Sequence, residues 1–219
     1  MSVRRREPNE RALVASTGLI VVKLGGSVVR STELQPWLDA IAQGAGRIVV
    51  VPGGGALADE VRSSQSSLGF GDAAAHRMAL LAMDQLAWAV AGLRPGFEVC
   101  DTEAALRNAL ARRQVAVWAP YALVSNRSDI PQSWTVTSDS LALWLSGRLQ
   151  AGACYVIKST RRKVSSISAD QLARDEIVDQ VFPSMLKQAG VQTYLLGRGD
   201  QPAFAAMLTG APACGASVD

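Results

Sequence analysis

The 219-residue sequence contains a single histidine, His76, and only three cysteines, Cys100, Cys154 and Cys214. A lone histidine has no second histidine with which to share a metal ion. The cysteines are widely spaced and odd in number, which favours free thiols in a reducing cytoplasm over disulfides or a zinc site. We therefore expect a cytoplasmic protein with no metal-ligating residues of its own.

A strong charge of one sign and a long apolar run are also missing. The formal net charge is +3, and four basic residues lie within the first eleven positions. The rest of the chain is close to neutral, which argues against a nucleic-acid partner. No run approaches the roughly 18–20 apolar residues of a membrane span, and no apolar segment follows the N-terminal arginines as in a secretory signal. We expect a disordered tail over residues 1–17 and one domain over 18–219.

Two common nucleotide-binding fingerprints are absent: the chain has neither a Walker-type Gly-Lys-Ser/Thr ending nor a GxGxxG pattern. Instead, two glycine turns follow apolar segments, reading VVKLGGS over 21–27 and VVVPGGG over 49–55. Glycine lets backbone N–H groups approach an anion, and a following helix adds partial positive charge. Either turn alone is explained by a tight strand–helix connection. Two together favour a pair of facing phosphate sites, which suits phosphoryl transfer.

Strand and helix patterns alternate along the chain. Short segments rich in Val, Ile and Leu predict strands near 18–24, 47–51, 96–100, 114–118, 153–158 and 191–196. Helices are predicted near 33–43, 55–66, 72–93, 102–112, 138–150, 169–175, 183–189 and 201–208. The pairs Asp101-Thr102 and Thr137-Ser138 resemble N-caps, and Ser168 with Gln171 resembles a capping box. This alternation predicts an α/β fold with a mostly parallel sheet covered on both faces.

Charged residues at element ends are candidates for chemistry. Lys23 directly precedes the first glycine turn, and its ammonium suits a transferring phosphoryl group. Lys158 ends an apolar strand, and Lys163 follows in a basic cluster, where ligands bind in open α/β sheets. Asp139 opens a predicted helix. It serves either the helix dipole alone or the orientation of the lysines around the phosphoryl group.

The predicted helix over 72–93 is the longest element and is apolar around much of its circumference. Such a helix suits either a buried core position or a dimer interface. Asp72 and His76 lie four residues apart on one face of it. They form either a simple hydrogen-bonded pair or part of an acceptor pocket opened by the second glycine turn.

These motifs together resemble the amino acid kinase superfamily. KLGGS at 23–27, PGGG at 52–55 and TSDSLA at 137–142 occur in that family's order and spacing, and the resemblance covers about residues 18–209. PGGGALADEVR at 52–62, DAAAHRMALLAMDQ at 72–85 and SWTVTSDSLALW at 133–144 are similar to the aminomethylfuran phosphate kinase branch of methanofuran biosynthesis.

The resemblance implies a three-layer α/β/α sandwich, a homodimer, and an enzyme that uses ATP and Mg²⁺. Its reaction would convert an aminomethylfuran methyl phosphate, a small-molecule substrate, to the diphosphate. The resemblance assigns the transferring phosphoryl group to Lys23, Gly25, Gly26 and Ser27, the acceptor to Gly53, Gly54 and Gly55, and the organisation of the lysines to Asp139. The residue patterns described above add Lys158 as a catalytic candidate, Lys163 as a candidate for a nucleotide phosphate, and Asp72 and His76 as candidates for binding the substrate.

The chain departs from this family pattern after Lys158. It reads Ser-Thr-Arg-Arg-Lys-Val-Ser-Ser over 159–166, whereas relatives carry an Asp-Gly-containing segment that lines the nucleotide site. Two alternatives therefore stand beside the leading hypothesis. One is a kinase for another phosphomonoester such as UMP, and the other is a non-catalytic nucleotide-binding or regulatory protein.

Overall fold

A computed structural model describes residues 18–160 and 164–219 of the chain. The predicted tail over residues 1–17 and the candidate Lys163 lie outside the described residues. The strands are β1 (Ile20–Leu24), β2 (Ile48–Pro52), β3 (Phe97–Cys100), β4 (Val115–Trp118), β5 (Ala153–Ile157), β6 (Ser166–Ile167), β7 (Gln192–Leu196) and β8 (Ala216–Val218).

These strands form one sheet in the order β3-β4-β2-β1-β5-β7-β8-β6. Neighbours from β3 to β7 run parallel, while β8 pairs antiparallel with β7 and parallel with β6. The prediction of a mostly parallel sheet is confirmed. From β1 the chain continues to β2 on one side of β1, and it later returns to β5 on the other side. The carboxyl ends of β1 and β5 therefore form a topological switch point, where open α/β sheets bind ligands.

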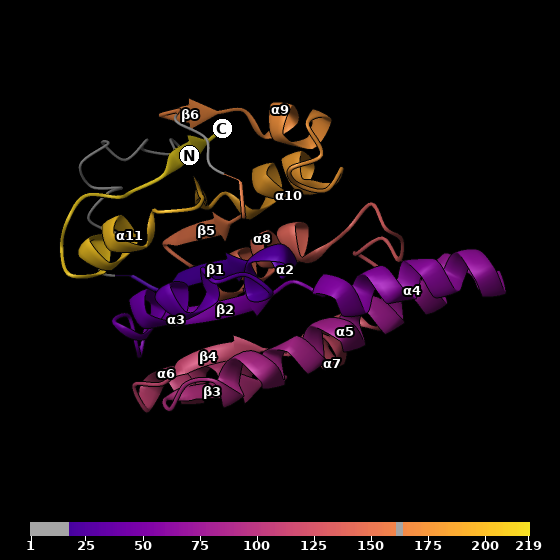
Figure 1. Cartoon of the computed structure of the whole chain (residues 1–219), viewed down its shortest axis with the longest axis horizontal. Coiled ribbons are helices and arrows are strands. Elements are labelled where there is room, and N and C mark those ends of the chain that lie inside the picture. Colours follow the sequence, from indigo (N-terminus) through magenta and orange to yellow (C-terminus); the bar gives the residue numbers. More distant parts are fainter. Residues whose placement is uncertain (1–17, 161–163) are drawn as a thin grey trace, which may run out of the picture.

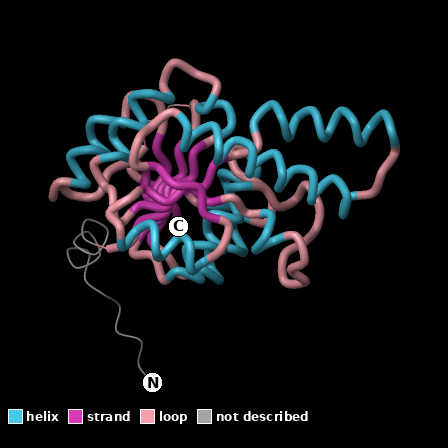
Figure 2. Tube along the Cα trace, turned by 90° about the horizontal axis from the view of Figure 1, so that it is seen from below, coloured by secondary structure: helices cyan, strands magenta, loops and turns pink. Residues whose placement is uncertain are grey.

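Helices cover the sheet on both faces (Figures 1 and 2), as the three-layer prediction requires. They are α2 (Gly26–Val29), α3 (Leu34–Ala42), α4 (Gly55–Leu68), α5 (Asp72–Gly92), α6 (Glu103–Ala111), α7 (Tyr121–Val124), α8 (Ser138–Leu149), α9 (Ala169–Arg174), α10 (Phe182–Ala189) and α11 (Gln201–Leu208). The two-residue β6, the three-residue β8 and the single-turn helices α2 and α7 were not predicted, because segments this short carry no readable period.

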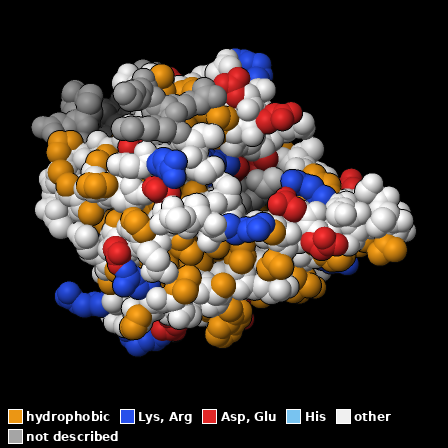
Figure 3. Space-filling model, viewed as in Figure 1, with side chains coloured by type: hydrophobic (Ala, Val, Ile, Leu, Met, Phe, Trp, Pro, Cys, Tyr) orange, Lys and Arg blue, Asp and Glu red, His pale blue; other side chains and the backbone are white. Residues whose placement is uncertain are grey.

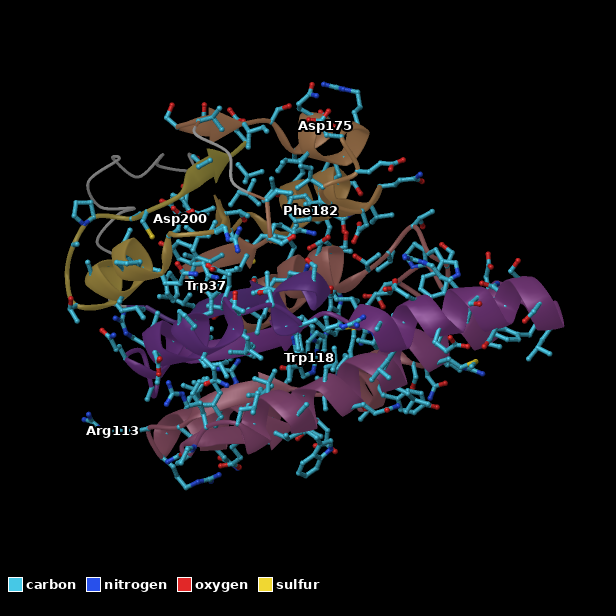
Figure 4. The ribbon with its side chains drawn as sticks, viewed as in Figure 1. Trp37, Arg113, Trp118, Asp175, Phe182 and Asp200 are labelled. Atoms are coloured by element: carbon cyan, nitrogen blue, oxygen red, sulfur yellow. The ribbon has the colours of Figure 1, made fainter. Side chains whose placement is uncertain are left out.

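Alternating side chains of the buried strands divide the core into two clusters. Val21, Val49 and Trp118 pack with α8 on one face, and Trp118 stacks on Trp144 with 6.0 Å between ring centroids. On the other face, Trp37 of α3 meets Phe204 of α11 edge to face. The labels in Figure 4 locate Trp37 and Trp118 in these two clusters.

Helices α4 and α5 form a hairpin that extends beyond the sheet (Figure 1). The helix α4 ends at Gly69, whose φ of +74° is a left-handed cap that glycine adopts without strain. The prediction that much of α5 is buried holds for one face only, since Met78, Leu81 and Trp88 are exposed on the other. Within the described ranges, no helix combines the length and apolarity that crossing a bilayer requires.

Candidate active site

The two glycine turns lie side by side at the carboxyl ends of β1 and β2. Leu24 and Pro52 are partners in the parallel register, and the Gly53 N–H donates to the Leu24 carbonyl at 2.8 Å. A Cβ on Gly26 would lie only 2.6 Å from the Cα of Gly55. Glycine is therefore needed here for backbone-to-backbone contact, in addition to any approach by a phosphate.

The first turn also contacts the strand on its other side. The Gly25 N–H donates to the Ile157 carbonyl at 3.0 Å, and a Cβ on Gly25 would lie 2.8 Å from that carbonyl oxygen. Ser27 and Ser159 are joined by a hydroxyl hydrogen bond of 3.1 Å. The parallel pairing of β1 with β5 thus brings Lys23, at the end of β1, close to Lys158, the residue that follows β5.

Asp139 lies between these two lysines. Its Oδ1 is 2.8 Å from Lys23 Nζ, and its Oδ2 accepts a hydrogen bond of 2.7 Å from Lys158 Nζ. Lys23 and Asp139 are 3% and 4% exposed. Two ammonium groups against one carboxylate leave an excess positive charge at a site with little water, which favours a polyanionic ligand.

Burial and mutual attraction act in opposite directions on these groups. Burial lowers the pKa of Lys23 from 10.5 to about 8, although the carboxylate of Asp139 partly opposes that shift. Burial alone would raise the pKa of Asp139, but the charges of Lys23 and Lys158 outweigh it and hold that pKa below its ordinary value. The carboxylate is therefore ionised at neutral pH and fixes the two lysine side chains.

The N-terminus of α8, which carries Asp139, is held by a second buried carboxylate. Asp179 Oδ2 accepts from the backbone N–H and the hydroxyl of Thr137 at 2.8 and 2.9 Å, and from the Ser140 N–H at 3.1 Å. Its Oδ1 accepts from the Ser140 hydroxyl and from the Phe182 N–H. Burial, followed by the charge of Asp139, raises the pKa of Asp179. Asp179 was not predicted, because it lies between two short helices and outside any recognisable motif.

A cavity of about 320 Å³ opens between the two glycine turns. Besides the triad of Lys23, Asp139 and Lys158, its wall includes the predicted residues Gly26, Ser27, Gly53, Gly54, Gly55 and His76. A second, larger cavity of about 900 Å³ lies toward α9 and α10. The two cavities share Arg62, Trp134, Thr137, Asp139 and Lys158, so they meet at the lysine–carboxylate centre.

The side chains of His76 and Asp72 lie in different environments, the first in the cavity wall and the second outside it. His76 is 5% exposed and lines the smaller cavity, and no protein group in the described ranges pairs with its buried Nε2. Burial and then the charge of Arg77 lower its pKa, so the imidazole is neutral at pH 7. Asp72 is not part of the cavity wall. Its carboxylate accepts a hydrogen bond of 2.8 Å from Gln65.

Gln65 connects Asp72 to an aromatic residue that was not predicted as part of the site. The Trp134 Nε1–H donates to Gln65 Oε1 at 2.6 Å, and the Arg62 guanidinium lies 4.4 Å from the centre of the Trp134 ring. Such a cation–π contact holds the arginine against the ring. Trp134 lies between helices α7 and α8, in a segment that carries no periodic signal by which its position could be predicted.

The residues described by the structure include no cluster of three or more His, Cys, Asp or Glu side chains suited to a metal ion. The two buried carboxylates at the site already have partners. Asp139 accepts a hydrogen bond from Lys158 and forms an ion pair with Lys23, while Asp179 accepts from several hydrogen-bond donors. The predicted Mg²⁺ therefore has no ligand cluster of this kind among the described residues, and it would be bound through the phosphate oxygens of a nucleotide.

Comparison with known proteins places this geometry in a family context. The family model described as "Amino acid kinase family" matches residues 18–180. A curated protein of Methanocaldococcus jannaschii, named [5-(aminomethyl)furan-3-yl]methyl phosphate kinase, is 26% identical in an alignment of 190 residues that covers 80% of this chain and 86% of that protein.

Solved structures share the fold at lower identity. The uridylate kinase of *Archaeoglobus fulgidus* superposes with a TM-score of 0.69 at 18% identity, covering 92% of this chain and 100% of that one. The UMP kinase of *Bacillus anthracis* gives a TM-score of 0.66 at 14% identity, covering 91% and 95%.

Proposed function

The chain belongs to the amino acid kinase family, and we propose that it is an ATP-dependent phosphotransferase whose acceptor is itself a phosphate ester. The observation that carries this proposal is the buried Lys23–Asp139–Lys158 centre at the junction of two cavities. A phosphoryl group passing from a donor in one cavity to an acceptor in the other would cross that centre.

We assign the smaller cavity to the acceptor and the larger one to the nucleotide. Gly53, Gly54 and Gly55 open α4, a helix of 14 residues whose first N–H groups and dipole favour an acceptor phosphate. His76 in the same wall offers an unpartnered nitrogen to the acceptor. The pair Gly25–Gly26 and Ser27 would hold the transferring phosphoryl group beside Lys23.

The nucleotide cavity extends from Lys158 toward α9 and α10. Lys163 stays a prediction for a nucleotide phosphate, because it lies outside the described residues. Asp72 is proposed to act on the acceptor side through Gln65, which accepts the hydrogen bond from Trp134 in the cavity wall.

The proposed reaction transfers one phosphoryl group. An oxygen of the acceptor phosphate forms a new bond to the γ-phosphorus of ATP, and the bond from that phosphorus to the β–γ bridging oxygen breaks. The electron pair leaves with ADP, and the acceptor becomes a diphosphate. The attacking oxygen is already anionic and needs no strong base, so positioning and neutralisation of charge by Lys23 and Lys158 provide most of the rate enhancement.

The favoured acceptor is an aminomethylfuran methyl phosphate, as in methanofuran biosynthesis. The Methanocaldococcus jannaschii relative supports this choice because its name specifies that acceptor and because it aligns with 80% of this chain. UMP is the second candidate, supported by the fold likeness to uridylate kinases. The altered segment after Lys158 favours a third candidate, a nucleotide-binding protein without turnover.

An acceptor panel separates these candidates. Purified protein is incubated with MgATP and either [5-(aminomethyl)furan-3-yl]methyl phosphate or UMP, and ADP release is measured. We expect the furan phosphate to give the higher kcat/KM. A preference for UMP would favour the second candidate. ATP binding without ADP release from either acceptor, in an assay where the relative is active, would favour the third.

We also infer that two copies of the chain pair through α5. Six of the seven exposed large hydrophobic residues in the described part lie on α4, on α5 or directly after it: Leu57, Leu68, Met78, Leu81, Trp88 and Leu93. Figure 3 shows hydrophobic side chains gathered along this edge. An antiparallel crossing of two α5 helices at the level of Met83, one residue beyond the helix centre, would set Met78 opposite Trp88 and Leu81 opposite Gln85.

Light scattering tests this pairing. Wild type should have the mass of a dimer, Trp88→Glu that of a monomer, and Val164→Glu that of a dimer, because Val164 is exposed away from α5. A monomeric wild type, or a dimer unaffected by Trp88→Glu, would contradict it.

A further inference from the structure

The acceptor cavity contains one carboxylate that the proposed phosphoryl transfer does not use. Its wall includes two acidic residues, Asp139 and Asp59. Asp139 is fully engaged by the two lysines. Asp59 is held more loosely: it forms an exposed ion pair with Arg62, whose Nη1 lies 3.7 Å away, beyond hydrogen-bond distance.

The position of Asp59 on α4 places it at the far end of the cavity from the phosphate site. Asp59 follows Gly55 by one helical turn, which is a rise of about 6 Å along the helix. Its side chain is 72% exposed, so it lies at the mouth of the cavity. Gly55 and the lysines, in contrast, lie at the buried end.

Apart from His76, Thr137 and Ser138, the wall between these two ends is apolar. Ala58, Ala79, Leu80, Met83, Val136 and Leu141 line it together with Trp134. A cavity with cations at one end, an apolar middle and a carboxylate at the mouth complements a ligand with a phosphate, a flat ring and a cation, in that order. Arg62 lies at the same mouth, where its guanidinium is shared between the Trp134 ring, 4.4 Å away, and the Asp59 carboxylate, 3.7 Å away.

We propose that Asp59 is a specificity residue that binds a protonated primary amine on the acceptor. The inference rests on the proposed function, and it selects acceptors that carry an ammonium group about one helical turn from the phosphate. The aminomethyl group of [5-(aminomethyl)furan-3-yl]methyl phosphate meets this condition. The uracil ring of UMP carries no such cation, so Asp59 gives it no attraction.

The test compares two ligands on three proteins. The ligands are [5-(aminomethyl)furan-3-yl]methyl phosphate and the analogue that carries a methyl group in place of the aminomethyl group. The proteins are wild type, Asp59→Asn and the matched control Glu60→Gln. Glu60 is the next residue on α4, its carboxylate accepts a hydrogen bond from Ser64, and it does not line the cavity. Binding is measured by titration calorimetry, and turnover by ADP release.

We expect wild type and Glu60→Gln to bind the amine about fivefold more tightly than the methyl analogue, near the upper end for an exposed ion pair. Asp59→Asn should lose this preference while its affinity for the methyl analogue stays unchanged. Equal weakening of both ligands by Asp59→Asn, an intact preference in that variant, or no binding of either ligand to wild type would overturn the inference. An Asp59-dependent binding preference without turnover would support the inference and overturn the proposed kinase activity.

Discussion

The two ends of the acceptor cavity differ in how their charges are held. At the buried end, Lys23 and Asp139 are almost fully enclosed, and each charge has a partner within 3 Å. At the mouth, the side chains of Arg62 and Asp59 are 51% and 72% exposed, and they are 3.7 Å apart. Buried, compensated charges suit chemistry because they need little reorganisation, whereas exposed charges weakly select among ligands.

The two ends of the cavity are also built from different parts of the fold, one enclosed and one exposed. The buried end is built from β1, β5 and the N-terminus of α8, which lie within the sandwich. The mouth is built from the protruding α4–α5 hairpin and the irregular segment that contains Trp134 (Figure 1). Substitutions at the buried end should therefore reduce kcat, and substitutions at the mouth should change KM.

The largest effect is expected for Lys23→Met. The substitution removes a buried ammonium from the transferring phosphoryl group, and kcat should fall by about a thousandfold. ADP release at saturating MgATP and acceptor measures it, with Lys187→Met, on the exposed side of α10, as the control. A Lys23→Met enzyme with kcat within tenfold of wild type would contradict a role for this lysine in the transition state.

Asp139→Asn should have the next largest effect. The amide keeps the shape of the side chain but leaves two ammonium groups without their shared counter-charge. We expect kcat to fall about a hundredfold and the free energy of unfolding to drop by about 3 kcal/mol. Urea denaturation and steady-state kinetics measure the two quantities. An unchanged stability would mean that the carboxylate does not compensate the buried lysines.

The lowered pKa of Lys23 predicts opposite pH trends for activity and stability. Because phosphoryl transfer needs the ammonium form, kcat/KM should fall about tenfold per pH unit above about 8. Between about pH 8 and pH 10.5, Lys23 is protonated more fully in the unfolded chain than in the folded one. The contribution of Lys23 to the free energy of unfolding should therefore increase as the pH rises through this range.

Lys23→Met serves as the reference in those pH measurements, since it should lack the Lys23 contribution to the stability profile. A stability difference between wild type and Lys23→Met that stays flat across this range would show that burial does not perturb the lysine.

Asp179→Asn tests the attachment of α8. An amide offers one acceptor oxygen where the carboxylate offers two, so at least one of the N–H groups of Thr137, Ser140 and Phe182 loses its partner. We expect a loss of about 2 kcal/mol in the free energy of unfolding and a fall in kcat of about fivefold. Asp170→Asn, on an exposed part of α9, is the stability control. Equal effects of the two substitutions would contradict the anchoring role.

The smallest effect is expected at the mouth. Trp134→Phe keeps an aromatic face for Arg62 but removes the hydrogen bond to Gln65. We expect the acceptor KM to rise about threefold with kcat within about twofold of wild type, the size of one neutral hydrogen bond. A larger loss in kcat than in KM would place Trp134 at the chemical centre instead.

The sequence predicted the buried end better than the mouth for a physical reason. Lys23, Asp139 and Lys158 each lie at the end of a strongly patterned strand or at the start of a capped helix, and a parallel sheet brings such ends together. Trp134 and Arg62 at the mouth, and Asp179 behind the buried end, act through contacts between segments far apart in the chain, and no local pattern marks them. The separation of Asp72 from His76 is of the same kind, because both lie on one helix but meet different neighbours.

The helix caps show the same limit on a smaller scale. Thr102 and Ser168 accept hydrogen bonds from Ala105 and Gln171 backbone N–H groups, as predicted from local sequence. The Gln171 side chain instead donates to Asp175, so the predicted capping box is only half formed. An N-cap hydrogen bond to a backbone N–H is determined by residues close in the sequence, whereas a long side chain such as that of Gln171 can bond to any of several neighbouring groups.

A crystal structure with a non-hydrolysable ATP analogue and [5-(aminomethyl)furan-3-yl]methyl phosphate tests the division between the two cavities most directly. We predict the γ-phosphate between Lys23 and Lys158, the nucleotide in the larger cavity, and the acceptor phosphate against the turn at Gly53–Gly55. A nucleotide bound away from both lysines, or an acceptor phosphate outside the glycine-lined cavity, would contradict phosphoryl transfer across the Lys23–Asp139–Lys158 centre.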